Sequence, residues 1–205
     1  MCLRLVGSEM CIRDSVNIGG ISNISCLSHG DKNLIGFDSG PGNTLIDAWM
    51  SNRFNMNYDE DGKIAAKGSS NHELIKIFLE DRYFKLKYPK STSTEYFSYE
   101  WILKNINKSK LNLNDNDILS TLTNLTAVSI VQSIDKYSKD CKEIYICGGG
   151  ANNNSIMKNI EDEAKRIISN QIIVKTTVDL NYHPKTFILY TSPSPRDVST
   201  YRMPS

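Results

Sequence analysis

Residues 36–43 read GFDSGPGN and connect a short apolar segment to a helical pattern. The apolar segment from Asn33 to Phe37 predicts a strand, which delivers one carboxylate, Asp38, into a bend rich in glycine and proline. An acid that follows a strand and precedes a helix stands where α/β folds place their chemistry. The alternative is a tight connection in which Asp38 only caps backbone amides. The sequence pattern alone does not decide whether the Asp38 carboxylate takes part in a reaction or has a structural role.

The helix expected after this bend begins near Asn43, a suitable N-cap, and its apolar residues over 45–54 recur at helical spacing. Asp47 lies one turn beyond Asn43 on the same face, so both side chains are expected to face the Asp38 bend. The loop 89–97 reads PKSTSTEYF; its lysine and hydroxyl groups suit an anionic substrate group, or the loop is simply solvated. The candidate substrate-side or supporting residues are Gly40, Gly42, Asn43, Asp47 and Lys90.

Composition narrows the class of protein. The 205 residues have a net charge of +1 and a 40% hydrophobic share, which suits one α/β or α+β domain. Such a charge gives no footprint for nucleic acid or a membrane surface, and no apolar run reaches the length of a bilayer span. Five cysteines without metal or redox spacing indicate reduced thiols in a cytoplasmic protein. We expect no nucleic acid, no membrane and no metal ligated by the chain.

Both ends differ in character from the rest of the chain. Residues 1–15 read MCLRLVGSEMCIRDS, and residues 190–205 read YTSPSPRDVSTYRMPS. Both segments resemble translated sequencing-adapter read-through, and neither has the periodicity of a core element. We therefore expect a disordered non-native leader over 1–15, a disordered non-native tail over 188–205, and between them, at 16–187, the folded part of a longer protein.

Two glycine turns stand far apart in the sequence. Residues 16–27 alternate apolar with small or polar residues around Gly19 and Gly20, which predicts strand, turn and strand. The turn either approaches a phosphate or is a plain hairpin. Later, a buried-type strand over 143–147 precedes a triple-glycine turn and a helix that Asn153 or Asn154 opens. The glycines of that turn are Gly148, Gly149 and Gly150.

A strand, a glycine turn and a helix start allow the backbone to approach a nucleotide closely. The pattern is not G-x-G-x-x-G, which disfavours a dinucleotide fold. The longest helix is expected over 115–137, and a further strand over 172–177.

Three motifs together resemble the C-terminal half of the anhydro-N-acetylmuramic acid kinase family in order and spacing: VNIGGISNIS (16–25), GFDSGPGNTLIDAW (36–49) and ICGGGANN (146–153). The resemblance covers about residues 16–180. It implies an α/β fold class, one lobe of the sugar kinase/Hsp70/actin (ribonuclease H-like) fold, with helices packed on a mixed sheet. In that fold the nucleotide binds in the cleft between two lobes, and the resemblance implies that residues 16–187 are the C-terminal lobe of a two-lobed kinase.

The same resemblance implies an ATP-dependent enzyme of peptidoglycan recycling. Such an enzyme opens the bridge of 1,6-anhydro-N-acetylmuramic acid with water and phosphorylates the sugar to N-acetylmuramic acid 6-phosphate. Asp38 matches the base that activates the water, Gly19 and Gly20 match a phosphate turn, and the triple-glycine turn matches the one beside the adenosine. ATP with Mg²⁺ and the amino sugar are the implied ligands, and a homodimer is left open.

Two departures from the family pattern matter. Ser93 and Thr94 stand where the family usually has Gly-Arg, and the family's N-terminal Gly-Thr-Met-Ser-Gly-Thr-Ser phosphate loop is missing from the 205 residues. We therefore expect this chain to be inactive alone. Two alternatives stay open: another sugar or acetate kinase of the same superfamily, and a non-catalytic nucleotide- or sugar-binding module.

Overall fold

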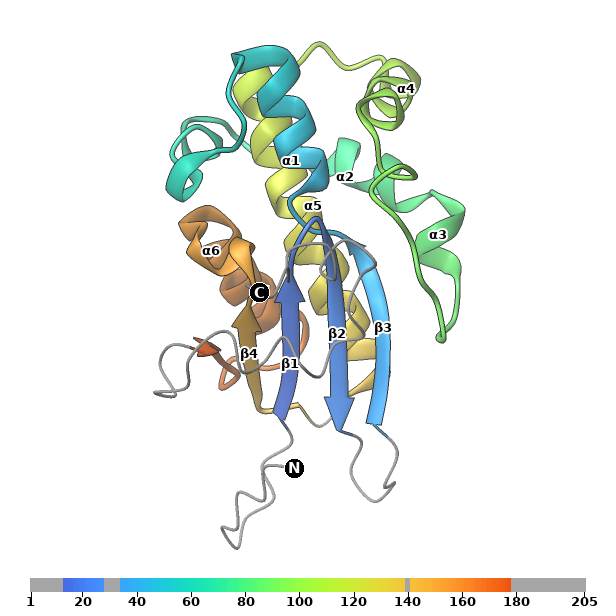
Figure 1. Ribbon diagram of the computed structural model, residues 1–205, viewed down its shortest axis with the longest axis vertical. Helices are drawn as coiled ribbons and strands as arrows, with labels where there is room; N and C mark the ends of the chain where they lie inside the picture. Colours follow the sequence, from blue (N-terminus) through green and yellow to red (C-terminus); the bar gives the residue numbers. More distant parts are fainter. Residues whose placement is uncertain (1–12, 28–33, 139–140, 178–205) are drawn as a thin grey trace, which may run out of the picture.

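The computed structural model describes residues 13–27, 34–138 and 141–177, and within these ranges five strands form a mixed sheet in the order β3-β2-β1-β4-β5 (Figure 1). The strands are β1 (Arg13–Ile18), β2 (Ile21–Leu27), β3 (Leu34–Pro41), β4 (Glu143–Cys147) and β5 (Ile173–Thr176). β1 to β3 form an antiparallel meander, while β4 and β5 run parallel to β1. The mixed sheet with helices packed on it confirms the expected fold class.

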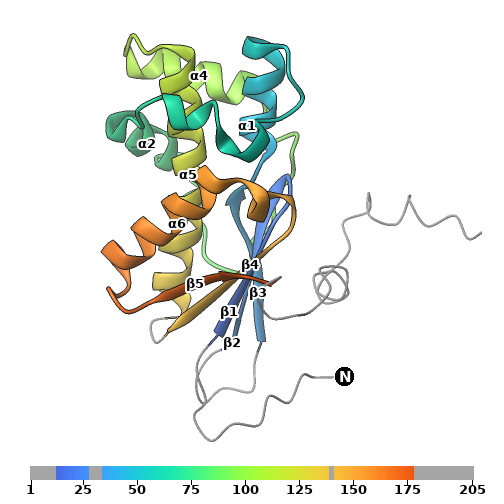
Figure 2. The ribbon, with the colours of Figure 1, turned by 90° about the vertical axis from the view of Figure 1, so that its left-hand side faces the viewer.

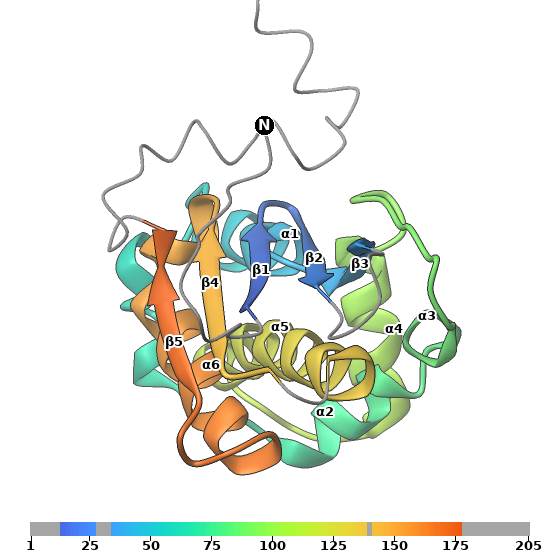
Figure 3. The ribbon, with the colours of Figure 1, turned by 90° about the horizontal axis from the view of Figure 1, so that it is seen from below.

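The helices divide between one face of the sheet and one end of it. They are α1 (Thr44–Trp49), α2 (His72–Leu79), α3 (Arg82–Lys85), α4 (Tyr99–Ser109), α5 (Asp115–Tyr137) and α6 (Asn154–Ile167). A π-helical turn, η1 (Met50–Phe54), continues α1, and short 3₁₀ turns are η2 (Glu60–Gly62), η3 (Ala65–Lys67) and η4 (Gly149–Asn152). Figure 2 shows α1, α2 and α4 gathered beyond the sheet, and Figure 3 shows α5 and α6 side by side on one face.

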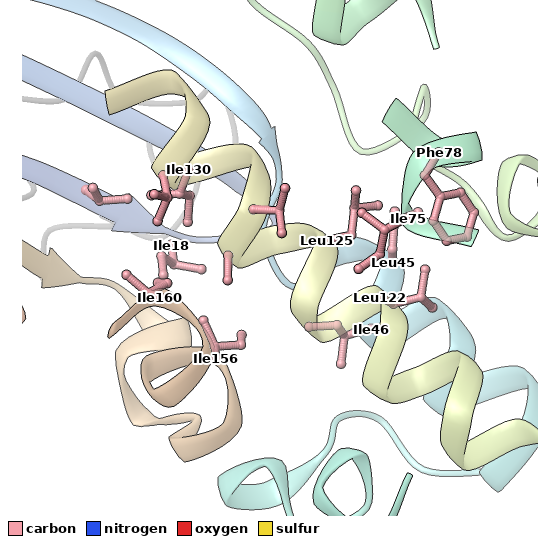
Figure 4. Packing of buried hydrophobic residues seen from close by; sticks show 14 of the residues in the cluster. Ile18, Leu45, Ile46, Ile75, Phe78, Leu122, Leu125, Ile130, Ile156 and Ile160 are labelled. Atoms are coloured by element: carbon pink, nitrogen blue, oxygen red, sulfur yellow. The ribbon is translucent and has the colours of Figure 1, made fainter. Parts of the chain in front are cut away.

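Helix α5 connects these two groups. Its first half packs on α1 and α2, where Leu122 and Leu125 meet Leu45 and Phe78 (Figure 4). Its second half lies against the sheet and α6, so the helix is buried on nearly all sides. The buried hydroxyls among these apolar residues bond to the carbonyl one turn back; the Thr123 hydroxyl, for example, donates to Leu119 O at 2.9 Å. The serine and threonine side chains of this helix are therefore compatible with burial.

Strand β3 is longer than the sequence indicates. The expected strand ends at Phe37, but β3 continues through Asp38 to Pro41. The extra residues pair with the start of β2 across a bulge at Ser22 and Asn23, which absorbs the irregular glycine-proline segment. The outer edge of β3 is also bonded, because the amide of Asp38 donates to Lys90 O at 3.1 Å. Asp38 thus lies inside an edge strand and not in a loop.

The N-terminal end of the sheet overlaps the expected leader. Strand β1 begins at Arg13, so residues 13–15 of the expected leader belong to the sheet, because β2 and β4 supply backbone partners on both sides of β1. Residues 1–12 and the expected tail, 188–205, lie outside the described residues. None of the helices in the described ranges combines the length and apolar character needed to cross a bilayer.

Candidate functional site

The Asp38 carboxylate accepts hydrogen bonds from three side-chain or backbone groups. Asn23 faces Asp38 across the β2–β3 pair and donates its Nδ2 to Oδ1 at 3.1 Å. The Ser91 hydroxyl and the Thr92 amide each donate to Oδ2 at 2.9 Å. A carboxylate has about four lone-pair sites, so one site on Oδ1 stays open to a water or a sugar hydroxyl. The carboxylate is held in one orientation and is still able to accept a proton.

The loop that contains Lys90 follows the outer edge of β3. Besides the bond from the Asp38 amide to Lys90 O, the Tyr83 hydroxyl donates to Asp38 O at 2.7 Å. Asp38 therefore has its amide, its carbonyl and its carboxylate bonded to residues 83–92. This bonding determines where the carboxylate points.

Tyr83 packs in a cluster of aromatic rings that includes Phe84, Tyr96 and Phe97. The Tyr83 ring is buried and meets the Phe97 ring edge-on, with centroids 5.4 Å apart. Asp81 caps the start of α3 by accepting the Tyr83 amide, and it also accepts the Tyr96 hydroxyl and Trp101 Nε1 at 2.8 and 2.9 Å. Burial raises the pKa of Asp81, but these hydrogen bonds outweigh it, and the pKa lies below its ordinary value. Asp81 is thus held as an anion that joins α3 to α4.

The Gly19–Gly20 turn is bonded to the start of α1. Gly19 O accepts the Asn43 amide at 2.8 Å, and Gly20 O accepts the amides of Gly42 and Thr44 at 2.9 and 3.1 Å. These carbonyls replace a side-chain cap, and the Asn43 side chain accordingly makes no capping bond. A Cβ at position 42 would lie 2.4 Å from Gly19 O, so the close approach requires glycine there. Gly20 remains exposed at the tip of the turn.

The triple-glycine turn lies beside the same junction. Gly148 has φ +84°, and a Cβ on Gly150 would meet Ile18 Cγ2 at 2.2 Å, so both glycines are needed for packing against β1. Gly149 is exposed, and its nearest neighbour is Asn43 Nδ2, 3.9 Å from a Cβ placed there. The fold thus brings the two glycine turns and Asn43 together at one end of the sheet.

Gly40, Asp47 and Lys90, three of the expected substrate-side or supporting residues, differ in their surroundings. Gly40 is buried, and a Cβ placed on it would lie 2.9 Å from the Phe84 ring and 3.3 Å from Ser129 Oγ. Asp47 is half-buried, and its carboxylate has no hydrogen-bond partner among the described residues; burial raises its pKa to about 6. Lys90 directs Nζ toward Ser39 O at 3.4 Å and over the Tyr83 ring at 4.5 Å.

The Lys90 ammonium lies on the opposite side of β3 from the Asp38 carboxylate. Phe37 packs on Tyr137 of α5 with ring centroids 5.0 Å apart, so alternation along the strand points Asp38 away from α5. Lys90 shares a pocket with α5 residues instead. Burial and the charge of Lys136 lower the pKa of Lys90 to about 8, against the opposing effect of Asp38. Across the described ranges no three His, Cys, Asp or Glu side chains come close enough to hold a metal ion.

A sequence model of the anhydro-N-acetylmuramic acid kinase family matches residues 4–187. This chain belongs to that family. The relative from Coxiella burnetii (strain Dugway 5J108-111) is 38% identical over 170 residues, which cover 82% of this chain and 44% of that protein. The relative from Hahella chejuensis is 42% identical over 145 residues, which cover 71% of this chain and 39% of that protein. Both are named anhydro-N-acetylmuramic acid kinase. The chain therefore spans less than half the length of these relatives.

Among solved structures, the activator of 2-hydroxyisocaproyl-CoA dehydratase from Clostridium difficile, with bound ADPNP, is similar at a TM-score of 0.46 and 15% identity. The match covers 83% of this chain and 55% of that one.

The sequence of this family member indicates Asp38 as a candidate base but does not indicate the groups that hold its carboxylate. Asn23 belongs to the motif VNIGGISNIS (16–25), and Ser91 and Thr92 belong to the loop PKSTSTEYF (89–97). Nothing in the spacing of these segments indicates that they meet at one carboxylate. Tyr83 had no signal in the sequence, because its contact with Asp38 depends on the packing of α3 on the edge of the sheet.

Proposed function

We propose that the protein is an ATP-dependent kinase of 1,6-anhydro-N-acetylmuramic acid that acts in cytoplasmic peptidoglycan recycling. Family membership and the names of the relatives support the substrate class. The observation that carries the chemistry is the Asp38 carboxylate, which three donors orient and which keeps an open lone pair. A base needs that arrangement: a fixed direction and a free site for the proton.

In the proposed reaction Asp38 takes a proton from water. The water oxygen forms a bond to the anomeric carbon, the bond from that carbon to the bridging oxygen breaks, and the bridging oxygen takes the γ-phosphoryl group of ATP. ADP leaves, and Asp38 later releases its proton to solvent. The anomeric carbon passes through a cation-like state, so the negative carboxylate stabilises that state in addition to acting as base.

The glycine turns are proposed to hold the nucleotide. Gly19 and Gly20 would approach the phosphates, and Gly148 to Gly150 would lie beside the adenosine. The fit rests on Gly20 and Gly149, which are exposed and adjoin the same junction around Asn43. Mg²⁺, held by the ATP phosphates, would neutralise oxygen charge during phosphoryl transfer. Asn43, the N-cap of α1, adjoins both turns, and Asp47 lies one helical turn further along α1.

We further propose that the 205-residue chain does not turn over substrate alone. It spans less than half of its relatives and contains no Gly-Thr-Met-Ser-Gly-Thr-Ser segment. Purified chain mixed with ATP and the anhydro-sugar is expected to give no sugar phosphate. A steady release of N-acetylmuramic acid 6-phosphate by the chain would contradict this proposal.

The function is tested on a gene product that extends over the full length of the relatives. With ATP and the anhydro-sugar in H₂¹⁸O, the product is expected to carry ¹⁸O on its anomeric carbon. Asp38→Asn is expected to lower kcat by about 10³-fold, within the range for a lost general base. Asp135→Asn is the matched control, because Asp135 is exposed on α5.

Two outcomes would refute the assignment. An Asp38→Asn enzyme with unchanged kcat would remove Asp38 as the base. Preferred turnover of acetate or of another sugar in a substrate panel would assign the protein to another kinase of the superfamily.

A further inference from the structure

A pocket lies between strand β3 and the C-terminal half of α5, on the side of the strand that faces away from the Asp38 carboxylate. Its volume is about 220 Å³, enough for several waters or a small oxyanion. Lys90 enters it from the loop along β3, and Lys136 enters it from α5. The lining contains these two ammonium groups and no carboxylate.

Neither lysine is neutralised by an ion pair within the described ranges. Lys136 Nζ lies over the Tyr137 ring at 5.2 Å, and Lys90 Nζ reaches only the Ser39 carbonyl, at 3.4 Å, and the Tyr83 ring. For the half-buried Lys90, a ring face and one long hydrogen bond replace little of the hydration that burial removes, whereas Lys136 is exposed. Two positive charges therefore line one pocket, and the Asp38 charge offsets them only in part, since the pKa of Lys90 stays lowered.

Neutral donors complete the lining. Tyr137 accepts the Tyr88 amide at 3.3 Å, which leaves its own hydroxyl hydrogen able to donate. Gln132 is exposed at the rim, and its amide has no partner in the described part of the chain. The Ser133 hydroxyl is committed to Ser129 O at 2.8 Å and so contributes an acceptor rather than a donor. Donors thus outnumber acceptors, as an anion requires.

We propose that this pocket binds a small oxyanion, a phosphate or a carboxylate, between the ammonium groups of Lys90 and Lys136. The inference is independent of the proposed kinase reaction, since strand β3 separates the pocket from the Asp38 carboxylate. The lowered pKa of Lys90 is consistent with it: burial and the Lys136 charge outweigh the opposing Asp38 charge, and a nearby anion would offset both. A bound anion would also hold Lys90 in place, and Lys90 O accepts the Asp38 amide.

The experiment is an NMR titration of the 205-residue chain with ¹³Cε-labelled lysine. Inorganic phosphate, acetate and chloride are added separately at constant ionic strength. Phosphate or acetate is expected to shift the Lys90 and Lys136 signals saturably and to raise the measured pKa of Lys90, whereas chloride is not. The stronger of the two responses identifies whether phosphate or carboxylate is the preferred chemistry.

Both variants replace exposed lysines, so neither is expected to disturb folding. Lys136→Met is expected to weaken anion binding by at least about tenfold, and Lys136 is exposed enough to tolerate the change. Lys104→Met, on the exposed side of α4, is the control and should bind as the parent does. An equal response to chloride, a linear response without saturation, or unchanged binding by Lys136→Met would each overturn the proposal.

Discussion

The Tyr83 hydroxyl donates to the main-chain carbonyl of Asp38 at 2.7 Å, and this bond joins an aromatic cluster to the edge strand that contains the proposed base. Tyr83 is buried and is fixed in turn by Asp81, which accepts its amide. The direction of the Asp38 carboxylate therefore depends on residues outside its own sheet.

Tyr83→Phe tests this dependence. The substitution leaves Asp38 O without its hydroxyl donor, and the loss should lower the free energy of unfolding by about 1 kcal/mol. In the complete enzyme we expect a lower kcat with little change in KM, because orientation of the base is affected more than binding. Urea denaturation and steady-state kinetics measure the two effects. Tyr58→Phe is the control, since Tyr58 is 60% exposed. Equal stability of the two variants would contradict the role given to Tyr83.

Asp47 gives a prediction about pH. Burial raises its pKa from 3.8 to about 6, so its contribution to stability is fully present below the unfolded value and is lost as pH rises through the folded value. Asp47→Asn should therefore raise the Tm relative to the parent near neutral pH, and the difference should shrink as pH falls toward about 4. Thermal melts across this range measure it, with Asp135→Asn as control. A Tm difference that does not change with pH would exclude the buried carboxylate as its cause.

Lys90 gives a second prediction about pH: its effect makes the protein more stable as pH rises, opposite to the effect of Asp47, and it does so at alkaline pH. Its pKa is lowered from 10.5 to about 8, so between these values the unfolded chain binds more protons and stability rises with pH. Lys90→Met should be more stable than the parent near neutral pH, and the advantage should disappear toward the upper value. Denaturation midpoints at a series of pH values, compared with those of Lys104→Met, measure this. A constant advantage would point to packing rather than to charge.

The triple-glycine turn allows folding to be separated from function. Gly150→Ala forces a Cβ against Ile18 and should destabilise the fold by about 1–3 kcal/mol. Gly149→Ala meets nothing closer than 3.9 Å and should fold as the parent does, while weakening nucleotide binding in the complete enzyme. Melting curves and ATP titrations report the two properties. Normal ATP affinity in Gly149→Ala would remove this turn from the proposed nucleotide site.

Local pattern was sufficient for the elements that form their own periodic surface. The strands on either side of Gly19, the helix over 115–137 and the strand before Gly148 all follow from apolar spacing, and the structure confirms them. The cap of α6 was also foreseen, since Asn153 Oδ1 accepts the Ile156 amide at 3.1 Å.

What could not be predicted depends on contacts distant in the sequence. The loop 89–97 is one example: Ser91 and Thr92 are bonded to Asp38, and helix α4 begins only at Tyr99, with Ser98 as its cap. The extension of β3 has the same kind of cause, since its extra residues have partners on β2 and at Lys90.

The hydrogen bonds between the Gly19–Gly20 turn and the start of α1 have a mechanical consequence. Three main-chain bonds at one junction leave no hinge between the turn and the helix, and α1 packs on α5, which reaches the sheet and α6. A displacement of Gly20 is therefore expected to shift α1 and the elements packed on it, and not the Gly19–Gly20 turn alone. Any opening or closing at this end of the sheet must move the glycine turn, Asn43 and α5 together.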